Sequence, residues 1–158
     1  MNLLHYIFGI LHYFGILIAV IGETHSFTKG SHMPLNWRNL TIYHYLLAAI
    51  FFWVGIEQHK ANLILRNLRK DKTGRFMNSG YAIPTGQLYN YISSPLQFLE
   101  ILVYMILSLI LWQANSFHFI TIWVIANQIT CCWMNQEWYT NTFSNYPKER
   151  KILIPFIY

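Results

Sequence analysis

The chain has 158 residues, of which 54% are hydrophobic, 18% are aromatic and only 11% are charged. An average soluble domain carries roughly 25% charged residues, so this composition excludes an ordinary water-soluble domain and predicts a membrane protein. The formal net charge of +5 would suggest nucleic-acid binding in a soluble protein, but here the basic residues flank apolar stretches, so we expect no nucleic-acid partner.

The length matches one domain, and nothing in the sequence divides it. There is no charge block, Gly/Ser linker or low-complexity tract, and no repeat with a period of about 20 to 50 residues. We therefore expect residues 1–158 to form a single membrane-embedded domain.

Four apolar segments approach the length of about 20 residues that a spanning helix needs. The first one follows an amino terminus without the basic region and cleavage site of a signal peptide, so we expect it to be retained as an anchor. The four segments are residues 3–21, 41–56, 98–112 and 117–133. The sequence thus predicts an all-α fold, a polytopic bundle of four spanning helices.

Basic residues are concentrated after the second and the fourth predicted helix. In the loop of residues 57–97 they outnumber the acidic Glu57 and Asp71, whereas residues 22–40 are much less basic. Because two helices separate this loop from the tail, both lie on one side of the membrane, which the positive-inside rule predicts to be cytosolic. The basic residues are Lys60, Arg66, Arg69, Lys70, Lys72 and Arg75 in the loop and Lys148, Arg150 and Lys151 in the tail.

The beginning and the end of this loop carry local structural signals. Residues 60–69 place Leu63, Ile64 and Leu68 at helical spacing, which predicts either an interfacial amphipathic helix or an extension of the second helix. Gly80, Pro84 and Gly86 then indicate turns. At the end of the loop, Ser94-Pro95 is typical of a helix start, because proline is tolerated in the first turn.

Two charged residues of this region invite a functional interpretation. Glu100 lies at the start of the third helix, where its carboxylate either reaches interfacial water or holds a cofactor group or a cationic side chain. Arg69 can pair with phosphate through its planar guanidinium group. Charge alone, however, favours a role in setting the membrane orientation or a contact with anionic lipid. A Rossmann site is unsupported, since no glycine-rich fingerprint follows a strand.

Aromatic, histidine and cysteine side chains give weaker signals. The aromatic residues at helix ends are typical of an interfacial belt. His12 and His44 are expected to make polar packing contacts, as is His5. Cys131 and Cys132 are adjacent and lack metal-ligand spacing, so we expect packing roles, no disulfide and no metal site. The aromatic residues are Tyr89, Tyr91, Trp138, Tyr139 and Tyr146.

Several short motifs, specific in their order and spacing, resemble the carboxyl-terminal half of the steroid 5α-reductase family, most closely its polyprenol/polyprenal reductase branch. They are Asn67-Leu68-Arg69-Lys70, Ile83-Pro84 with Gly86, Tyr91-Ile92-Ser93-Ser94-Pro95, Glu100, Trp138-Tyr139, and Tyr146-Pro147-Lys148 with Arg150-Lys151 through Ile154-Pro155-Phe156-Ile157-Tyr158. The resemblance implies an all-helical membrane enzyme of the endoplasmic reticulum that uses NADPH to reduce a double bond conjugated to a carbonyl.

For the polyprenol branch, the resemblance implies reduction of the α-isoprene unit of a polyprenoid lipid on the route to dolichol, which supports protein N-glycosylation. Membrane lipids would be the other partners. By position in the motifs, Arg69 would take phosphate, and Glu100 and Tyr139 would fix the adenosine or nicotinamide portion. Catalytic residues are not assigned, and the implied NADPH-binding residues are Gln58, Asn62, Arg69, Tyr81, Tyr91, Glu100 and Tyr139.

The chain also departs from the family pattern. Ala82 stands where the family usually has Arg, and Leu96 where it usually has Asn, so two polar cofactor contacts are lost. We expect the chain to lack the amino-terminal helices of full-length members. Two alternatives stay open: a catalytically impaired short form that binds membrane lipid or partners, and an isoprenylcysteine methyltransferase-like enzyme using S-adenosylmethionine, against which the tail motif and Asn67-Leu68-Arg69 argue.

Overall fold

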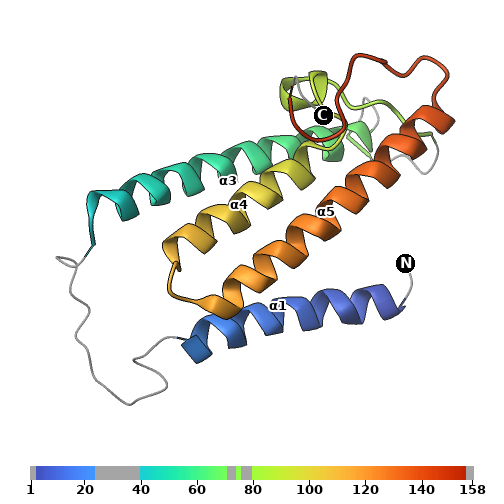
Figure 1. Ribbon diagram of the computed structural model, residues 1–158. Coiled ribbons are helices and arrows are strands. Elements are labelled where there is room, and N and C mark those ends of the chain that lie inside the picture. Colours follow the sequence, from blue (N-terminus) through green and yellow to red (C-terminus); the bar gives the residue numbers. More distant parts are fainter. Residues whose placement is uncertain (1–2, 24–39, 71–73, 76–79, 156–158) are drawn as a thin grey trace.

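The computed structural model describes residues 3–23, 40–70, 74–75 and 80–155. Within these ranges the chain is helical, with no strand and one isolated parallel bridge between Ile92 and Lys151. The predicted all-α fold is confirmed, with four α-helices and one short 3-10 helix in the described part (Figure 1). These are α1 (Leu3–Glu23), α3 (Ile42–Leu68), η2 (Gln87–Asn90), α4 (Pro95–Ile110) and α5 (Asn115–Thr142).

Two helices are longer than their apolar segments. α3 continues to Leu68 instead of ending at residue 56, so of the two predictions for residues 60–69 the extension of the second helix is correct. α5 continues to Thr142 instead of ending at residue 133. Hydropathy marks where a helix leaves an apolar environment, whereas a helix itself continues until a breaking residue or a cap ends it.

α4 packs between α3 and α5 (Figure 1). Toward α3 the core contains Leu47, Val54 and Ala61 of α3 with Leu99 and Ile106 of α4, so on each helix the buried positions recur every seven residues. A seven-residue repeat keeps one face of a helix against its partner, as in left-handed bundle packing. This repeat therefore determines which face of each helix meets the other.

A second core holds α1 and α5 against the other side of α4. Tyr104 of α4 packs with Phe117 and Val124 of α5, and Ile16 and Val20 of α1 lie against them. The Tyr104 and Phe117 rings are stacked, with centroids 6.3 Å apart. This core explains why α1, which is distant from α4 in the sequence, still belongs to the bundle.

Histidines contribute the polar contacts that the sequence predicts. His12 Nε2 lies 3.3 Å from the Tyr104 hydroxyl and links α1 to α4. His44 accepts a hydrogen bond of 3.2 Å from the backbone N–H of Thr41 and so caps the start of α3. Both are packing or capping contacts, as expected, whereas the side chain of His5 lies outside the described residues.

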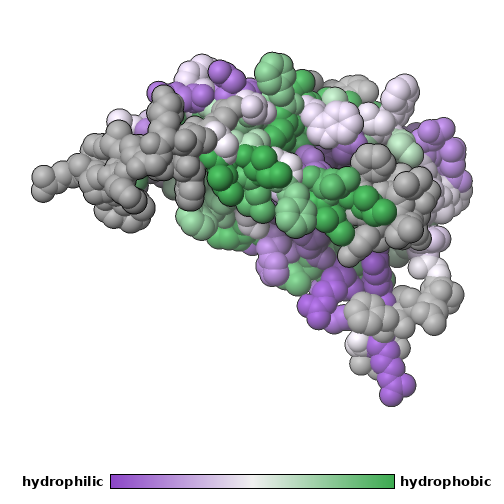
Figure 2. Space-filling view, turned by 90° about the horizontal axis from the view of Figure 1, so that it is seen from below, coloured by the Kyte–Doolittle hydropathy of each residue, from purple (hydrophilic) through white to green (hydrophobic). Residues whose placement is uncertain are grey.

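The outer surface of the bundle is strongly apolar. Ile18 of α1, Phe52 of α3 and Phe119 of α5 are each about 70% exposed, at 69%, 70% and 75%. Figure 2 shows hydrophobic side chains together in the middle of the face seen from below, with hydrophilic ones toward its lower edge. Exposed apolar surface on several helices is expected of a protein surrounded by lipid.

Among the described residues, one helix is long and apolar enough to cross a membrane, namely α5. Its 28 residues are about 42 Å long, against a hydrocarbon core of about 30 Å. Shorter apolar stretches are Gly9–Gly22 and Pro95–Ile110. The helices agree with a membrane bundle, and the four predicted spans remain a prediction.

The basic loop and the tail lie at the same end of the bundle, as the helix count predicts (Figure 1). α3 and α5 end there, and η2 and the start of α4 lie beside them. We call this end, formed by residues 57–70, 80–100 and 136–155, the tail end. Gly86, whose φ of +103° is strained for other residues, starts the turn into η2, and Pro95 occupies the first turn of α4.

We expect Leu99→Ala to loosen the packing of α3 on α4, because Leu99 is 1% exposed within that core. Comparable substitutions in water-soluble cores cost about 2–5 kcal/mol, and we expect about 1–3 kcal/mol here because lipid, like a core, solvates a leucine. Unfolding in detergent measures the change. Met105→Ala is the matched control, since Met105 lies on the exposed side of α4, and an equal loss in both variants would contradict this packing.

Candidate functional site

A hydrogen bond joins α3 to α4 at the tail end. Gln58 Nε2 donates to Glu100 Oε2 over 2.6 Å, and both side chains are partly buried. The partner of the Glu100 carboxylate is thus an amide, neither a cationic side chain nor a cofactor group, and both interpretations of Glu100 stay predictions. Two of the seven predicted residues thus meet across 42 positions of sequence.

Asn62 and Arg69 lie further along α3 and line one pocket of about 420 Å³. Arg69 is exposed and follows the last residue of α3, where its N–H donates to the carbonyl of Arg66 over 3.2 Å. Arg69 lies eleven residues after Gln58, about 16 Å along the helix axis. The described lining residues are His59, Asn62, Leu63, Leu65, Arg66 and Arg69.

An aromatic cluster covers the end of α5. Trp138 contacts Tyr81 and Tyr139, with ring centroids 5.1 Å apart in both pairs. Tyr139 in turn stacks on Tyr146 of the tail, with centroids 5.2 Å apart and 10° between the planes. Tyr81 is 78% exposed, so its ring borders the cluster from the outside. Trp138 therefore connects two predicted residues that lie far apart in the sequence.

Tyr91 lies where the loop meets the tail. Its side chain is exposed, and its carbonyl accepts a hydrogen bond of 2.9 Å from the Lys151 N–H. Nearby, Tyr89 is buried in η2, and burial, together with a smaller effect of Tyr139, raises the pKa of its phenol. The Tyr89 hydroxyl consequently stays protonated at neutral pH.

The structure also identifies residues that the sequence analysis did not assign to the site. Ser93 bonds to Gln136 of α5, and Tyr146 donates to Ser93 Oγ over 2.7 Å. Arg150 is 8% exposed and lies over the Tyr146 ring, 5.6 Å from its centroid. Ser93, Tyr146 and Arg150 all lie in the motifs that carry the family resemblance. Their position in these motifs was the signal by which the sequence could have assigned them to the site.

Arg150 places a buried guanidinium group at the tail end. Within the described part of the chain, its Nη1 is the buried side-chain nitrogen that has no hydrogen-bond partner. A buried guanidinium without a full set of acceptors is costly, so a site with such a group suits an anionic ligand.

The two departures from the family pattern have different surroundings. Leu96 is partly buried and packs against the core of α3 and α4, so an apolar residue there contributes to bundle packing. Ala82 is exposed and follows Tyr81 directly. The structure thus gives a packing role to the residue at 96 and none to the residue at 82.

The tail end therefore presents an elongated set of groups rather than a compact catalytic centre. Gln58 and Glu100 bond directly, Asn62 and Arg69 share a pocket, and Tyr81 and Tyr139 share an aromatic cluster. Gln58 and Asn62 lie one turn apart on α3, so the first two groups are neighbours along this helix. Among the described residues, no group of three His, Cys, Asp or Glu side chains is placed to hold a metal ion.

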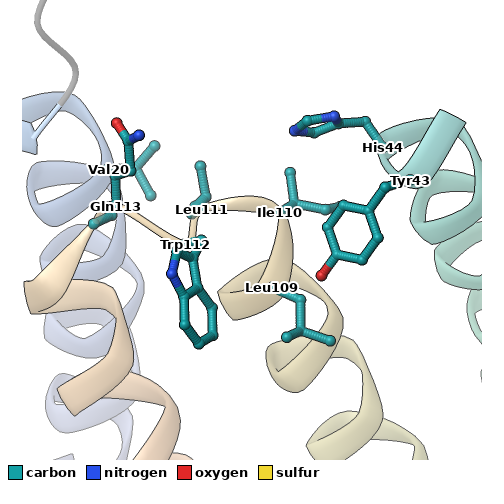
Figure 3. Close-up of a pocket in the computed structure, with 9 residues that line it drawn as sticks. Val20, Tyr43, His44, Leu109, Ile110, Leu111, Trp112 and Gln113 are labelled. Carbon is teal, nitrogen blue, oxygen red and sulfur yellow. The ribbon is translucent and has the colours of Figure 1, made fainter. Parts of the chain in front are cut away.

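A larger pocket of about 590 Å³ lies at the opposite end of the bundle, where α3 begins and α4 meets α5 (Figure 3). Its lining is mostly apolar, with polar atoms from Tyr43, His44 and Gln113. None of the seven predicted residues lies among its described lining. The lining residues are Val20, Tyr43, His44, Leu109, Ile110, Leu111, Trp112, Gln113 and Ala114.

A family model and individual relatives both match this chain, and they agree with each other. Residues 14–158 match the family described as 3-oxo-5-alpha-steroid 4-dehydrogenase. The chain is 37% identical over 158 residues to polyprenal reductase of Drosophila melanogaster, and 34% identical over 161 residues to that of Caenorhabditis elegans. It is also 28% identical over 166 residues to the human polyprenal reductase.

These alignments include 99% of the chain but only 48%, 51% and 50% of the three relatives. The chain therefore spans about half the length of the curated relatives that it matches.

We expect a double-mutant cycle of Gln58→Ala and Glu100→Ala to give a coupling of about 1–2 kcal/mol, because a hydrogen bond to a charged group that is partly buried contributes about that much. Unfolding in detergent provides the four free energies. Lys60→Ala, which removes the ion pair with Glu57 from the surface of α3, should cost no more than about 0.5 kcal/mol. Additive effects of the first two substitutions would show that the contact is absent in solution.

Proposed function

The chain belongs to the 3-oxo-5-alpha-steroid 4-dehydrogenase family, and on this basis we propose that it forms part of a polyprenal reductase. The reaction is the NADPH-dependent reduction of the α-isoprene double bond of polyprenal or polyprenol on the route to dolichol, which supports protein N-glycosylation. The observation that carries this proposal is the similarity to polyprenal reductases along 99% of the chain.

The tail end provides the residues for cofactor binding. Arg69 and Asn62 would hold a phosphate group, Gln58 and Glu100 would fix a polar part of the cofactor, and the tyrosines would contact its rings or ribose. The axial spread of about 16 Å from Gln58 to Arg69 suits an elongated dinucleotide better than a small ligand. The proposed residues are Gln58, Asn62, Arg69, Tyr81, Tyr91, Glu100 and Tyr139.

The donor set of the tail end fits an anionic cofactor. Arg69 and Arg66 line one pocket, and the buried Arg150 has an Nη1 without a hydrogen-bond partner in the described chain. Planar guanidinium groups suit phosphate oxygens because two parallel N–H groups can bond to the same phosphate. NADPH, when bound, supplies a hydride for the β-carbon of the enal.

The chain's own residues orient the reactants in this proposal. The hydrogen bond from Gln58 fixes one carboxylate oxygen of Glu100, which leaves the remaining acceptor positions of this carboxylate for the cofactor. The stack of Tyr139 on Tyr146 holds one ring of the site in a defined plane. Reduction requires the two reactants to be held in near-attack geometry, and rigid side chains of this kind lower its entropic cost.

We further propose that the protein is a multi-pass protein of the endoplasmic reticulum membrane, with four spans and with the tail end in the cytosol. The apolar outer surface supports a lipid environment in which a polyprenoid substrate and membrane lipids are available. The shared position of the basic loop and the tail supports the orientation.

Cysteine labelling tests this topology. In a variant with Cys131 and Cys132 replaced, we expect a single cysteine at Thr85 or at Ser144 to react with a membrane-impermeant maleimide in sealed microsomes with the cytosolic face outward. The physical reason is that both positions lie at the tail end and are exposed. Labelling of only one of them would show that the two positions lie on different sides of the membrane. Protection of both would show that the tail end faces the lumen.

The activity itself is tested with the purified chain in detergent, NADPH and a polyprenal. We expect product formation with cofactor oxidation, and a KM for NADPH that rises about 10- to 100-fold in Arg69→Ala, since a charge-assisted hydrogen bond contributes about 1.5–3 kcal/mol. Lys148→Ala removes an equal charge from an exposed part of the tail and should change this KM less than about twofold. If the wild-type chain shows no turnover and does not bind NADPH, the proposal is overturned.

A second candidate function is lipid binding without reduction. The pocket of about 590 Å³ at the opposite end of the bundle, which six apolar residues line together with Tyr43, His44 and Gln113, favours it, as do the residues at 82 and 96. In the same assay, this function would appear as polyprenal binding without cofactor oxidation. Binding of S-adenosylmethionine in place of NADPH would instead indicate a methyltransferase.

A further inference from the structure

The tail is bonded to the segment that enters α4. The Ser93 N–H donates to the Lys151 carbonyl over 2.8 Å, and the Lys151 N–H donates to the Tyr91 carbonyl over 2.9 Å. These two bonds form the parallel bridge between Ile92 and Lys151. Ile92 is fully buried and Leu153 packs on Ile101 and Cys132, so the attachment is apolar as well as polar.

The Ser93 hydroxyl is the centre of the attachment. It accepts the hydrogen bond of 2.7 Å from the Tyr146 hydroxyl. Its single hydrogen can be donated to Gln136 Oε1 or to the Lys151 carbonyl, which lies 3.2 Å away. One small side chain therefore joins α5, the start of α4 and the tail.

This arrangement is buried and satisfied. Ser93 is 3% exposed and Tyr146 is 7% exposed. Beside it, Asn135 of α5 donates to Ser94 Oγ over 3.3 Å. Removing one partner from a buried network leaves the other groups without water or protein to bond, so loss of a single hydroxyl affects the whole contact.

The network adjoins two residues of the proposed cofactor site. The Tyr91 carbonyl accepts the bond from Lys151 beside Ser93, and Tyr139 stacks on the Tyr146 ring. The network can fix their relative positions without itself contacting a ligand.

We propose that Ser93 and Tyr146 are positioning residues, whose hydrogen bond locks the tail onto α4 and α5 and so sets Tyr91 and Tyr139 at the spacing that binds the cofactor. This inference rests on the proposed function. Its specific content is that the hydroxyl of Tyr146, rather than its ring alone, determines cofactor affinity.

Tyr146→Phe tests this content, because it removes the hydroxyl and keeps the ring that stacks on Tyr139 and lies near Arg150. We expect the Kd for NADPH, measured by fluorescence titration of the full chain in detergent, to rise about 3- to 10-fold, in keeping with loss of one buried hydrogen bond. Ser93→Ala, which removes the other hydroxyl, should give a similar rise. The KM for polyprenal should stay within about twofold, because the hydroxyl lies beside residues proposed for the cofactor and not for the lipid.

Thr140→Ala is the matched control. Thr140 is an exposed hydroxyl on the same part of α5, and it bonds to the carbonyls of Gln136 and Glu137 in its own helix. We expect it to leave the Kd unchanged. Hydrogen exchange of the Ser93 and Lys151 amides gives a readout independent of NADPH, and it should become at least about threefold faster in Tyr146→Phe and not in Thr140→Ala.

The outcomes separate the two proposals. If wild-type protein does not bind NADPH, the proposed function fails and the positioning role fails with it, while the exchange rates still report whether the tail is locked. If wild-type protein binds NADPH and Tyr146→Phe binds it equally well, the positioning role alone is overturned. A lower unfolding midpoint with faster exchange but unchanged Kd would likewise overturn it, because the contact would then be purely structural.

Discussion

The packing of α4 between α3 and α5 is the constraint on which the rest of the structure depends. Its seven-residue repeat of buried side chains on α3 and α4 fixes which faces of the helices meet. The packing of α4 on α3 places Glu100 opposite Gln58, and the packing of α4 on α5 brings Ser93 and Ser94, at the start of α4, against α5. A shift of one helix by a single turn would separate both sets of polar partners.

Several polar residues inside this bundle are paired between segments distant in the sequence, whereas the buried Thr121 bonds to the Phe117 carbonyl within α5. Gln58 meets Glu100, His12 meets Tyr104, and Ser93 meets Gln136. In a lipid environment such pairs avoid the cost of an unsatisfied polar group, and each pair also selects one register of the helices it joins. The same residues that stabilise the bundle at its tail end therefore also arrange the proposed cofactor site.

Much of the fold could be predicted from the sequence, and less of the site. The four α-helices, the start of α4 at Pro95 and the common position of the basic loop and the tail follow from hydropathy, turn residues and helix count. The extension of α3 was one of two alternatives from the sequence, and the end of α5 was not predicted, because the hydropathy of the chain falls before the helix ends. The family motifs contained Ser93, Tyr146 and Arg150, yet short motifs do not say which side chains are buried or which partners they meet.

The sequence by itself determined that this is an all-helical chain with a membrane protein's composition, because apolar periodicity and charge distribution are local properties of the chain. Only the tertiary structure decided that Glu100 accepts a hydrogen bond from the Gln58 amide, that Leu96 packs against the core of α3 and α4, and that Tyr146 of the tail bonds to Ser93. These facts depend on how helices distant in the sequence pack against one another. No local pattern of residues specifies such a register.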